Sequence, residues 1–178
     1  MSATVAPMPD DVFTSLRSFI TGVIGGSPAV EVIKGLGNRV AMPAAPFIAI
    51  TSLFMIPLAT NIDSWDITNP APTNLSVARS TRYDIQVDSY GPLSGSWGSM
   101  LTILFRDEYA CIALAPTCQP LYAEDARQIA LVAGEEQYIE RWSFTAAIAY
   151  SPVVTVAAQF ADALAAGLIN VDVVYPPS

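Results

Sequence analysis

The stretch RSTRYDIQVDSYGPLSGSW (residues 79–97) decides how the rest of the chain is interpreted. Polar and apolar residues alternate in its first part, and successive side chains of a β-strand point to opposite faces. The pattern predicts a strand with a polar face (Arg82, Asp84, Gln86, Asp88 and Tyr90) and an apolar face (Tyr83, Ile85 and Val87). Ser94 or Ser96 can then cap a helix, which we expect to pack on the apolar face.

The polar face of this predicted strand carries two carboxylates, Asp84 and Asp88. Four strand residues separate them by roughly 13 Å, at about 3.3 Å per residue. That distance is too long for a shared proton and exceeds the spacing of a glycosidase pair. We therefore interpret the face as an exposed polar surface and not as a catalytic site.

The flanking segments predict an α+β fold, a mostly antiparallel β-sheet packed by two main α-helices. A first helix should begin near Asp10 or Asp11, either of which can cap it, and end at Gly25-Gly26. The apolar residues 47–56 predict a central strand, residues 97–111 the second helix, and residues 135–150 a further strand. Residues 153–167 should begin as a strand and end in a short helix, and residues 168–175 should form the last strand. We expect a single domain over residues 1–178, with a flexible arm at 1–9 and a long loop at 59–76.

Composition excludes several classes of function. The chain has 178 residues and a net charge of −8, so we do not expect it to bind nucleic acid phosphates directly. It has no histidine, the usual general base and the commonest zinc ligand. No secretory signal is apparent, so a reducing cytoplasm is expected, and Cys111 and Cys118 should be buried free thiols.

Residues 40–62 contain no charged residue, which raises the possibility of a membrane span. Pro43, Pro46 and Pro57 interrupt the segment, and no Lys/Arg cluster flanks it. We therefore expect no membrane contact. The apolar surplus is better explained by interfaces between subunits.

No catalytic, cofactor or metal site is predicted. The adjacent acidic pairs Asp107-Glu108, Glu124-Asp125 and Glu135-Glu136 have no spacing that would make them converge on a metal ion. The glycine-rich stretches also lack the spacing of a dinucleotide or phosphate-binding loop. The sequence therefore indicates a protein that is not an enzyme.

The expected long loop contains a candidate docking site, with Trp65 between Asp63 and Asp66. Loops of this length are usually functional or disordered. Trp65 could dock onto a partner, or it could pin the loop to its own domain.

Several strings in the chain are similar to a known family. KGLGNRVAMPAAPFIAIT, TRYDIQVDSYGP, LFRDEYA, PLYAEDARQ, GEEQYIERW and GLINVDVVYPP resemble the neck-terminator or tail-completion (tail-terminator) proteins of contractile-tailed bacteriophages, over residues 33–177. The resemblance implies a structural virion protein, a homohexameric ring at the head–tail junction that terminates the tail tube. Its implied partners are other copies of the chain, the tail tube and sheath proteins, and the head connector or adaptor. It would be located in the neck of the virion and assembled in the host cytoplasm.

Genomic DNA would pass through the lumen of such a ring without specific binding. A face carrying Asp84, Gln86 and Asp88 would suit that lumen because carboxylates repel phosphates; a solvated outer face is the alternative. Another structural tail or head-completion protein, such as a tail-tube subunit, is also open. A small enzyme or ligand-binding protein would instead need a deep pocket where Asp107, Glu108 or Glu124 converge.

Overall fold

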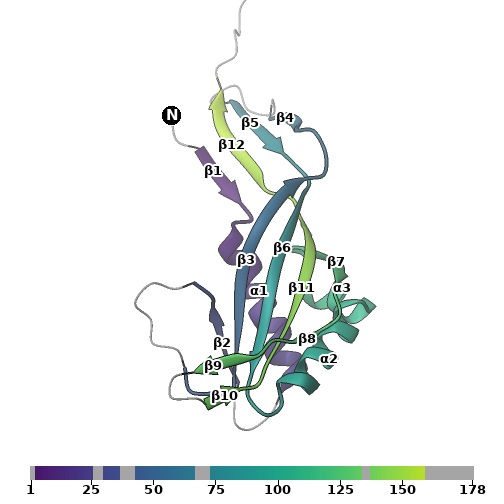
Figure 1. The fold of residues 1–178 in the computed structure, drawn as a ribbon. Coiled ribbons are helices and arrows are strands. Elements are labelled where there is room, and N and C mark those ends of the chain that lie inside the picture. The colour runs from purple at the N-terminus through teal and green to yellow at the C-terminus, as the bar shows by residue number, and fades with distance from the viewer. Residues whose placement is uncertain (1–2, 26–29, 37–42, 67–72, 134–136, 159–178) are drawn as a thin grey trace, which may run out of the picture.

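The computed structural model describes residues 3–25, 30–36, 43–66, 73–133 and 137–158. Two larger sheets and three helices make up most of this part of the chain (Figure 1). The main sheet has the strand order β2 (Glu31–Lys34), β3 (Phe47–Pro57), β6 (Thr81–Tyr90), β11 (Arg141–Tyr150) and β7 (Gln119–Ala123). A sixth short strand, β8 (Arg127–Gln128), also pairs with β11.

The predicted α+β class is confirmed, because helices pack against a sheet in which, among the described strands, only the β2–β3 pair is parallel. The helices are α1 (Pro9–Ile24), α2 (Ser94–Phe105) and the short α3 (Glu108–Leu114). The sequence predicted α1 and α2, but its second helix, over residues 97–111, combined α2 with the first turn of α3. Helix α2 ends at Phe105 with Arg106 as its C-cap. The Asp107 carboxylate then caps α3 by accepting a hydrogen bond from the Tyr109 N–H at 3.0 Å.

The apolar face of β6 packs under the helices as predicted. Tyr83, Ile85 and Val87 lie in one buried cluster with side chains of α1 and α2, among them Leu16, Phe19, Ile20, Trp97, Leu101 and Phe105. Fully burying each aliphatic or aromatic side chain contributes about 1.5–3 kcal/mol. This helix-covered side fixes β6 in the middle of the sheet and leaves its polar face on the opposite side.

Helix α1 begins slightly earlier than either predicted cap. Its first residue is Pro9 and its N-cap is Met8, so Asp10 and Asp11 lie in the first turn. The Asp11 carboxylate still stabilises the helix start, because it accepts a hydrogen bond from the Met8 N–H at 2.6 Å. Gly25 ends the helix, as the sequence predicted.

A second sheet of four strands lies beyond the helices at one end of the molecule (Figure 1). Its order is β1 (Ala3–Ala6), β12 (Val153–Ala158), β5 (Thr73–Ala78) and β4 (Ile62–Asp66). The expected arm at 1–9 and loop at 59–76 were therefore wrong where β1, β4 and β5 lie. Each of these strands is short, and each is held by hydrogen bonds to strands that the local pattern does not reveal.

The remaining described strands are β9 (Leu131–Ala133) and β10 (Gln137–Ile139), which form a small hairpin. The predicted short helix at 160–166 and last strand at 168–175 lie outside the described residues. Among the described residues, no helix has both the length and the apolar character needed to cross a membrane.

Cys111 and Cys118 are both free thiols, as predicted, but only Cys118 is buried. Ala110 and Leu114 form the buried side of α3, so Cys111 points to solvent and the expectation that it is buried was wrong. Burial raises the pKa of the Cys118 thiol to about 11.

Candidate functional site

The polar face of β6 lies on the side of the sheet opposite the helices, and its first carboxylate is paired within the strand. Arg82 donates to both oxygens of Asp84, with Nε–Oδ1 2.6 Å and Nη2–Oδ2 2.8 Å. Alternation brings the two side chains to the same face, and the planar guanidinium matches the carboxylate with two parallel bonds. The Asp84 side chain is 2% exposed, whereas the Arg82 side chain is 43% exposed. The arginine therefore covers the carboxylate.

The second carboxylate, Asp88, has partners on two strands. The Gln86 amide donates to its oxygens at 3.0 and 2.9 Å. From the neighbouring strand β11, Arg141 donates to Asp88 Oδ1 through Nη2 at 3.0 Å and Nε at 3.2 Å. Arg141 also lies over the ring of Tyr90, which stacks on Phe47 with ring centroids 4.4 Å apart. Burial raises the pKa of the Tyr90 hydroxyl, so it stays neutral.

These contacts change what the polar face presents to its surroundings. We expected exposed carboxylates, but Asp84 and Asp88 are 2% and 3% exposed, so that expectation was wrong. Each carboxylate is paired with one guanidinium, so the four groups carry no net charge. Arg82 and Gln86 are the more accessible members of the row. Whether Asp84, Gln86 and Asp88 face a lumen stays a prediction.

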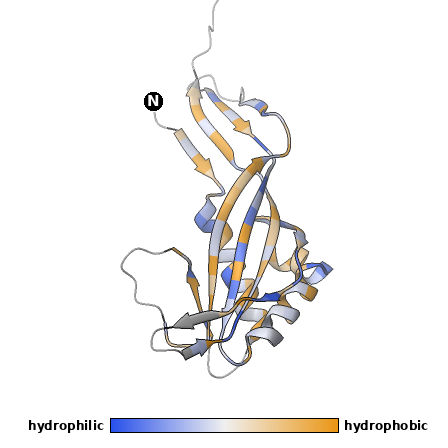
Figure 2. Ribbon diagram, viewed as in Figure 1, coloured by the Kyte–Doolittle hydropathy of each residue, from blue (hydrophilic) through white to orange (hydrophobic). Residues whose placement is uncertain are grey.

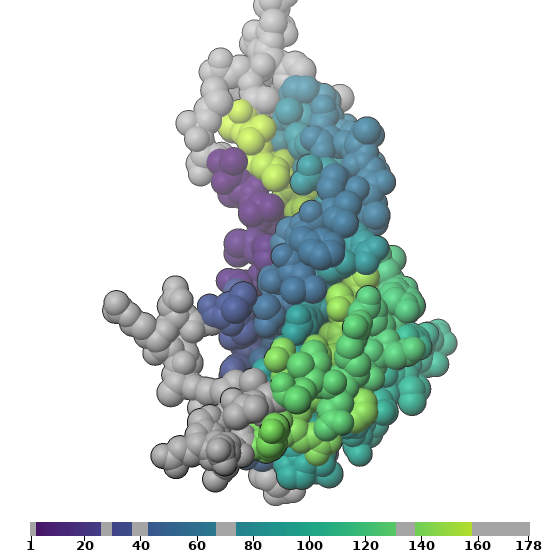
Figure 3. All heavy atoms as spheres, in the orientation of Figure 1, coloured from purple at the N-terminus to yellow at the C-terminus, as the bar shows by residue number. Residues whose placement is uncertain are grey.

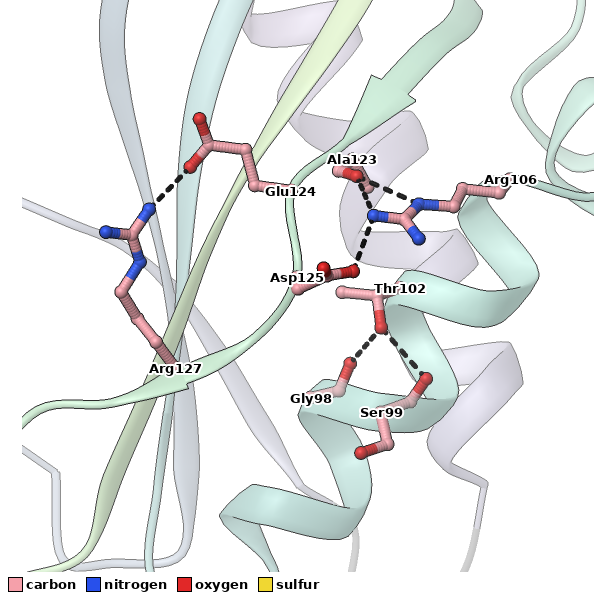
Figure 4. Close-up of polar contacts among 8 residues, drawn as sticks. All are labelled: Gly98, Ser99, Thr102, Arg106, Ala123, Glu124, Asp125 and Arg127. Atoms are coloured by element: carbon pink, nitrogen blue, oxygen red, sulfur yellow. Dashed lines mark hydrogen bonds and ion pairs between the residues drawn. The ribbon is translucent and has the colours of Figure 1, made fainter.

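The acidic pairs do not converge in the described part of the chain. Glu124 accepts a hydrogen bond from Arg127 at 2.9 Å, whereas Asp125 accepts one from Arg106 at 2.8 Å, in a different direction (Figure 4). Arg106 also donates to the Ala123 carbonyl at the sheet edge, and Asp107 caps α3. Within the described residues, no three acidic or cysteine side chains could hold a metal ion together. Glu135 and Glu136 lie outside these residues.

The outer half of β3 carries a row of exposed apolar side chains, so the prediction of a central strand over residues 47–56 was wrong for this half. Leu53, Phe54, Met55 and Ile56 are 42%, 52%, 44% and 43% exposed, and Leu58 follows them at 52%. Strand β2 pairs with β3 only at residues 47–50, so among the described strands the β3 edge beyond Ile50 has no neighbour on that side. Figure 2 shows the hydrophobic colour continuing along β3, and Figure 3 shows the same region at the surface.

We call residues 53–58 the β3 apolar edge. Unpaired strand edges are sites where another chain can add a strand, and globular proteins commonly protect them with proline or charge. The β3 apolar edge contains Pro57, and the opposite edge, β7, contains Pro120. Only the β7 edge also has a charged side chain on its backbone, because Arg106 donates to the Ala123 carbonyl. The β3 apolar edge has no charged residue and lies within the uncharged segment 40–62, whose apolar surplus the sequence led us to assign to subunit interfaces.

The candidate docking residues Asp63, Trp65 and Asp66 lie on β4, an outer strand of the four-stranded sheet. Because residues alternate along the strand, Asp63 and Trp65 share one face and Asp66 lies on the other. Trp65 is 46% exposed. The structure therefore brings two of the three predicted residues to a single face, and their role in docking stays a prediction.

The chain matches the model of a known protein family. The family model described as phage neck terminator protein matches residues 10–174, which is most of the chain. The curated proteins include no significant match.

Proposed function

Because the chain belongs to the phage neck terminator protein family, we propose that it forms a homohexameric ring at the head–tail junction of a contractile-tailed phage. Membership of the family makes it a structural protein of the phage neck that contacts other phage structural proteins. The ring would end the growing tail tube and join it to the head connector or adaptor, and DNA would pass through its lumen. Assembly would take place in the host cytoplasm.

The β3 apolar edge is the observation that supports a ring most directly. The large apolar side chains of this edge are 42–52% exposed in one subunit, and we expect another protein surface to bury them. A ring requires a heterologous interface, in which one surface of each subunit meets a different surface of the next and the rotation closes. A free strand edge on one side of the sheet supplies one half of such an interface.

The arrangement of the sheet suggests how a subunit would sit in the ring. Helices cover one face, the polar row lies on the other, and the β3 apolar edge lies at the side. With the helices outward and the edges toward neighbouring subunits, Asp84, Gln86 and Asp88 would face the channel. The arginines that pair with the carboxylates already have acidic partners, which weakens their attraction to DNA phosphates. The β4 residues Asp63, Trp65 and Asp66 would contact a neighbouring subunit or tail protein.

Native mass spectrometry and electron microscopy of the purified protein test this function. We expect closed rings with six times the 18.9 kDa mass of the chain. Open filaments would instead favour a tail-tube subunit. A monomer at high protein concentration, together with tails of normal length in phage that lack the protein, would contradict a terminator ring.

A further inference from the structure

The main sheet has two edges that no other described strand covers, and the register places them at the same level. Strand β7 is the last in the strand order, and β3 lacks a described neighbour beyond Ile50 on its outer side. One row of cross-strand pairs crosses the sheet between these edges, from Phe54 on β3 through Asp84 and Ala147 to Tyr122 on β7. Phe54 and Tyr122 therefore mark the two ends of a single row, with β6 and β11 between them (Figure 1).

Both ends of this row are apolar and exposed. On β7, Tyr122 is 54% exposed and its neighbour Leu121 is 51% exposed, which matches the exposed side chains of the β3 apolar edge. Cross-strand partners share a face, so Phe54 and Tyr122 lie on the same side of the sheet. Residues 119–123 carry no charge, and neither does the β3 apolar edge. Contact between the two edges would therefore bury apolar surface without bringing like charges together.

The symmetry of a ring makes this equal level informative. Rotation about a ring axis changes neither the height of a residue along the axis nor the direction of a strand along it. With the strands along the axis, the β3 apolar edge of one subunit would meet β7 of the next subunit at the same height. Three successive antiparallel pairings lead from β3 to β7, so the two edges run in opposite directions. Neighbouring sheets would therefore meet in antiparallel orientation.

We propose that the β3 apolar edge of one subunit packs against β7 of the next subunit, with Phe54 beside Tyr122 of that second copy. The inference rests on the proposed ring, and it identifies the second half of the ring interface. Side chains carry the contact, because Pro120 has no N–H to donate and Arg106 already occupies the Ala123 carbonyl. Each subunit has one copy of each edge, so all edges are covered only when the ring closes.

Disulfide cross-linking tests the proposal in the full-length protein. The background variant carries Cys111→Ser to remove the exposed thiol and keeps the buried Cys118. The test variant adds Phe54→Cys and Tyr122→Cys. Within one subunit, the three strand spacings between these positions amount to roughly 14 Å, at about 4.8 Å each, which is too far for a disulfide. A disulfide between the two introduced cysteines can therefore form only between subunits.

The matched control replaces Tyr122→Cys with Ile103→Cys, at an exposed position on α2. We expect oxidised rings of the test variant to contain covalent multimers of up to six chains, roughly tenfold more abundant than in the control. Rings that form normally but cross-link equally in both variants would overturn this inference and leave the proposed function standing. Cross-linking by Phe54→Cys alone would also overturn it, because two β3 edges would then meet each other.

Chemical modification of the unmodified rings decides the matter if the cysteine variants do not assemble. Met55 on the β3 apolar edge and Met100 on α2 are 44% and 39% exposed in the single chain. In rings, peroxide should oxidise Met55 several-fold more slowly than Met100. Nitration by tetranitromethane gives the same comparison for Tyr122 against Tyr109, which is 46% exposed on α3.

Equal reactivity within either pair would contradict the proposed contact, because one of the two edges would then stay exposed in the ring. Failure of the unmodified protein to form rings would contradict the proposed function itself.

Discussion

At the scale of single residues, the polar row of β6 is a set of mutually satisfied charges. Asp88 accepts hydrogen bonds from Gln86 on its own strand and from Arg141 on β11, and it is almost fully buried. Burying a carboxylate is costly unless it is paired and hydrogen-bonded. The row therefore acts as a link between two strands, and its members depend on one another.

Removal of one member of the row should be costly. In Asp88→Ala, the Arg141 and Gln86 side chains lose their acceptor, and we expect the free energy of unfolding to fall by about 2 kcal/mol. The expected loss is below the roughly 3–5 kcal/mol of a fully buried pair, because the Arg141 side chain is 20% exposed. Urea unfolding measures it. In the control Asp125→Ala, the side chain is 91% exposed, so the change should be below about 0.5 kcal/mol. Equal losses in the two variants would show that the row contributes no special stability.

At the scale of elements, β3 changes its environment along its length. Phe47, Ile48 and Ile50 are buried between β2 and β6, whereas residues 53–56 lie past the end of β2 and are exposed. One apolar sequence run thus supplies both core and surface. The two halves are also offset by a β-bulge between Ser52 and Phe54, which increases the local twist of the strand.

A charge on the β3 apolar edge should prevent assembly without unfolding the subunit. Phe54 is 52% exposed in the single chain, so Phe54→Glu should change the free energy of unfolding by less than about 0.5 kcal/mol. Buried at a subunit contact, the same carboxylate would be desolvated without a partner, and we expect at least a tenfold loss of rings by light scattering. Ile103→Glu is the control, because Ile103 lies on α2 and is 68% exposed. If both variants assemble like the unmodified chain, the edge is not a subunit contact.

At the scale of the whole molecule, each side of the main sheet has a different character. The helical side is packed, the opposite side carries the neutralised polar row, and one edge is apolar and has no partner among the described strands. This three-way division fits the proposed ring, in which a subunit would present one surface to the channel, another to its neighbours and a third to the outside.

A positive charge added to the polar row tests which way this face of the main sheet points. Gln86→Lys retains a donor for Asp88 and adds one charge per subunit to a half-buried position on that face. If the face lines the channel, rings of this variant should bind duplex DNA, and the affinity should fall steeply with added salt. Fluorescence anisotropy at several salt concentrations measures this. Ser99→Lys, on the exposed side of α2, adds the same charge on the outside. Equal binding by both variants would exclude the lumen assignment.

The sequence by itself determined the elements whose signal is local. The alternation in residues 81–90 defined both faces of β6, the apolar period and Gly25 defined α1, and the absence of histidine and of converging acids argued against catalysis. The family resemblance over residues 33–177 agrees with the family match over residues 10–174. These features depend on near neighbours in the chain, so a pattern of a few residues is enough to predict them.

Only the tertiary structure decided which polar groups are buried and which apolar groups are exposed. Asp88 is buried because Arg141, 53 residues away in the chain, covers it. Strands β1 and β4 exist because β12 and β5 pair with them, and the outer half of β3 is exposed because β2 ends at Lys34. Each outcome depends on a partner that is distant in sequence. A local sequence pattern does not contain the free energy of such a contact, so it cannot predict it.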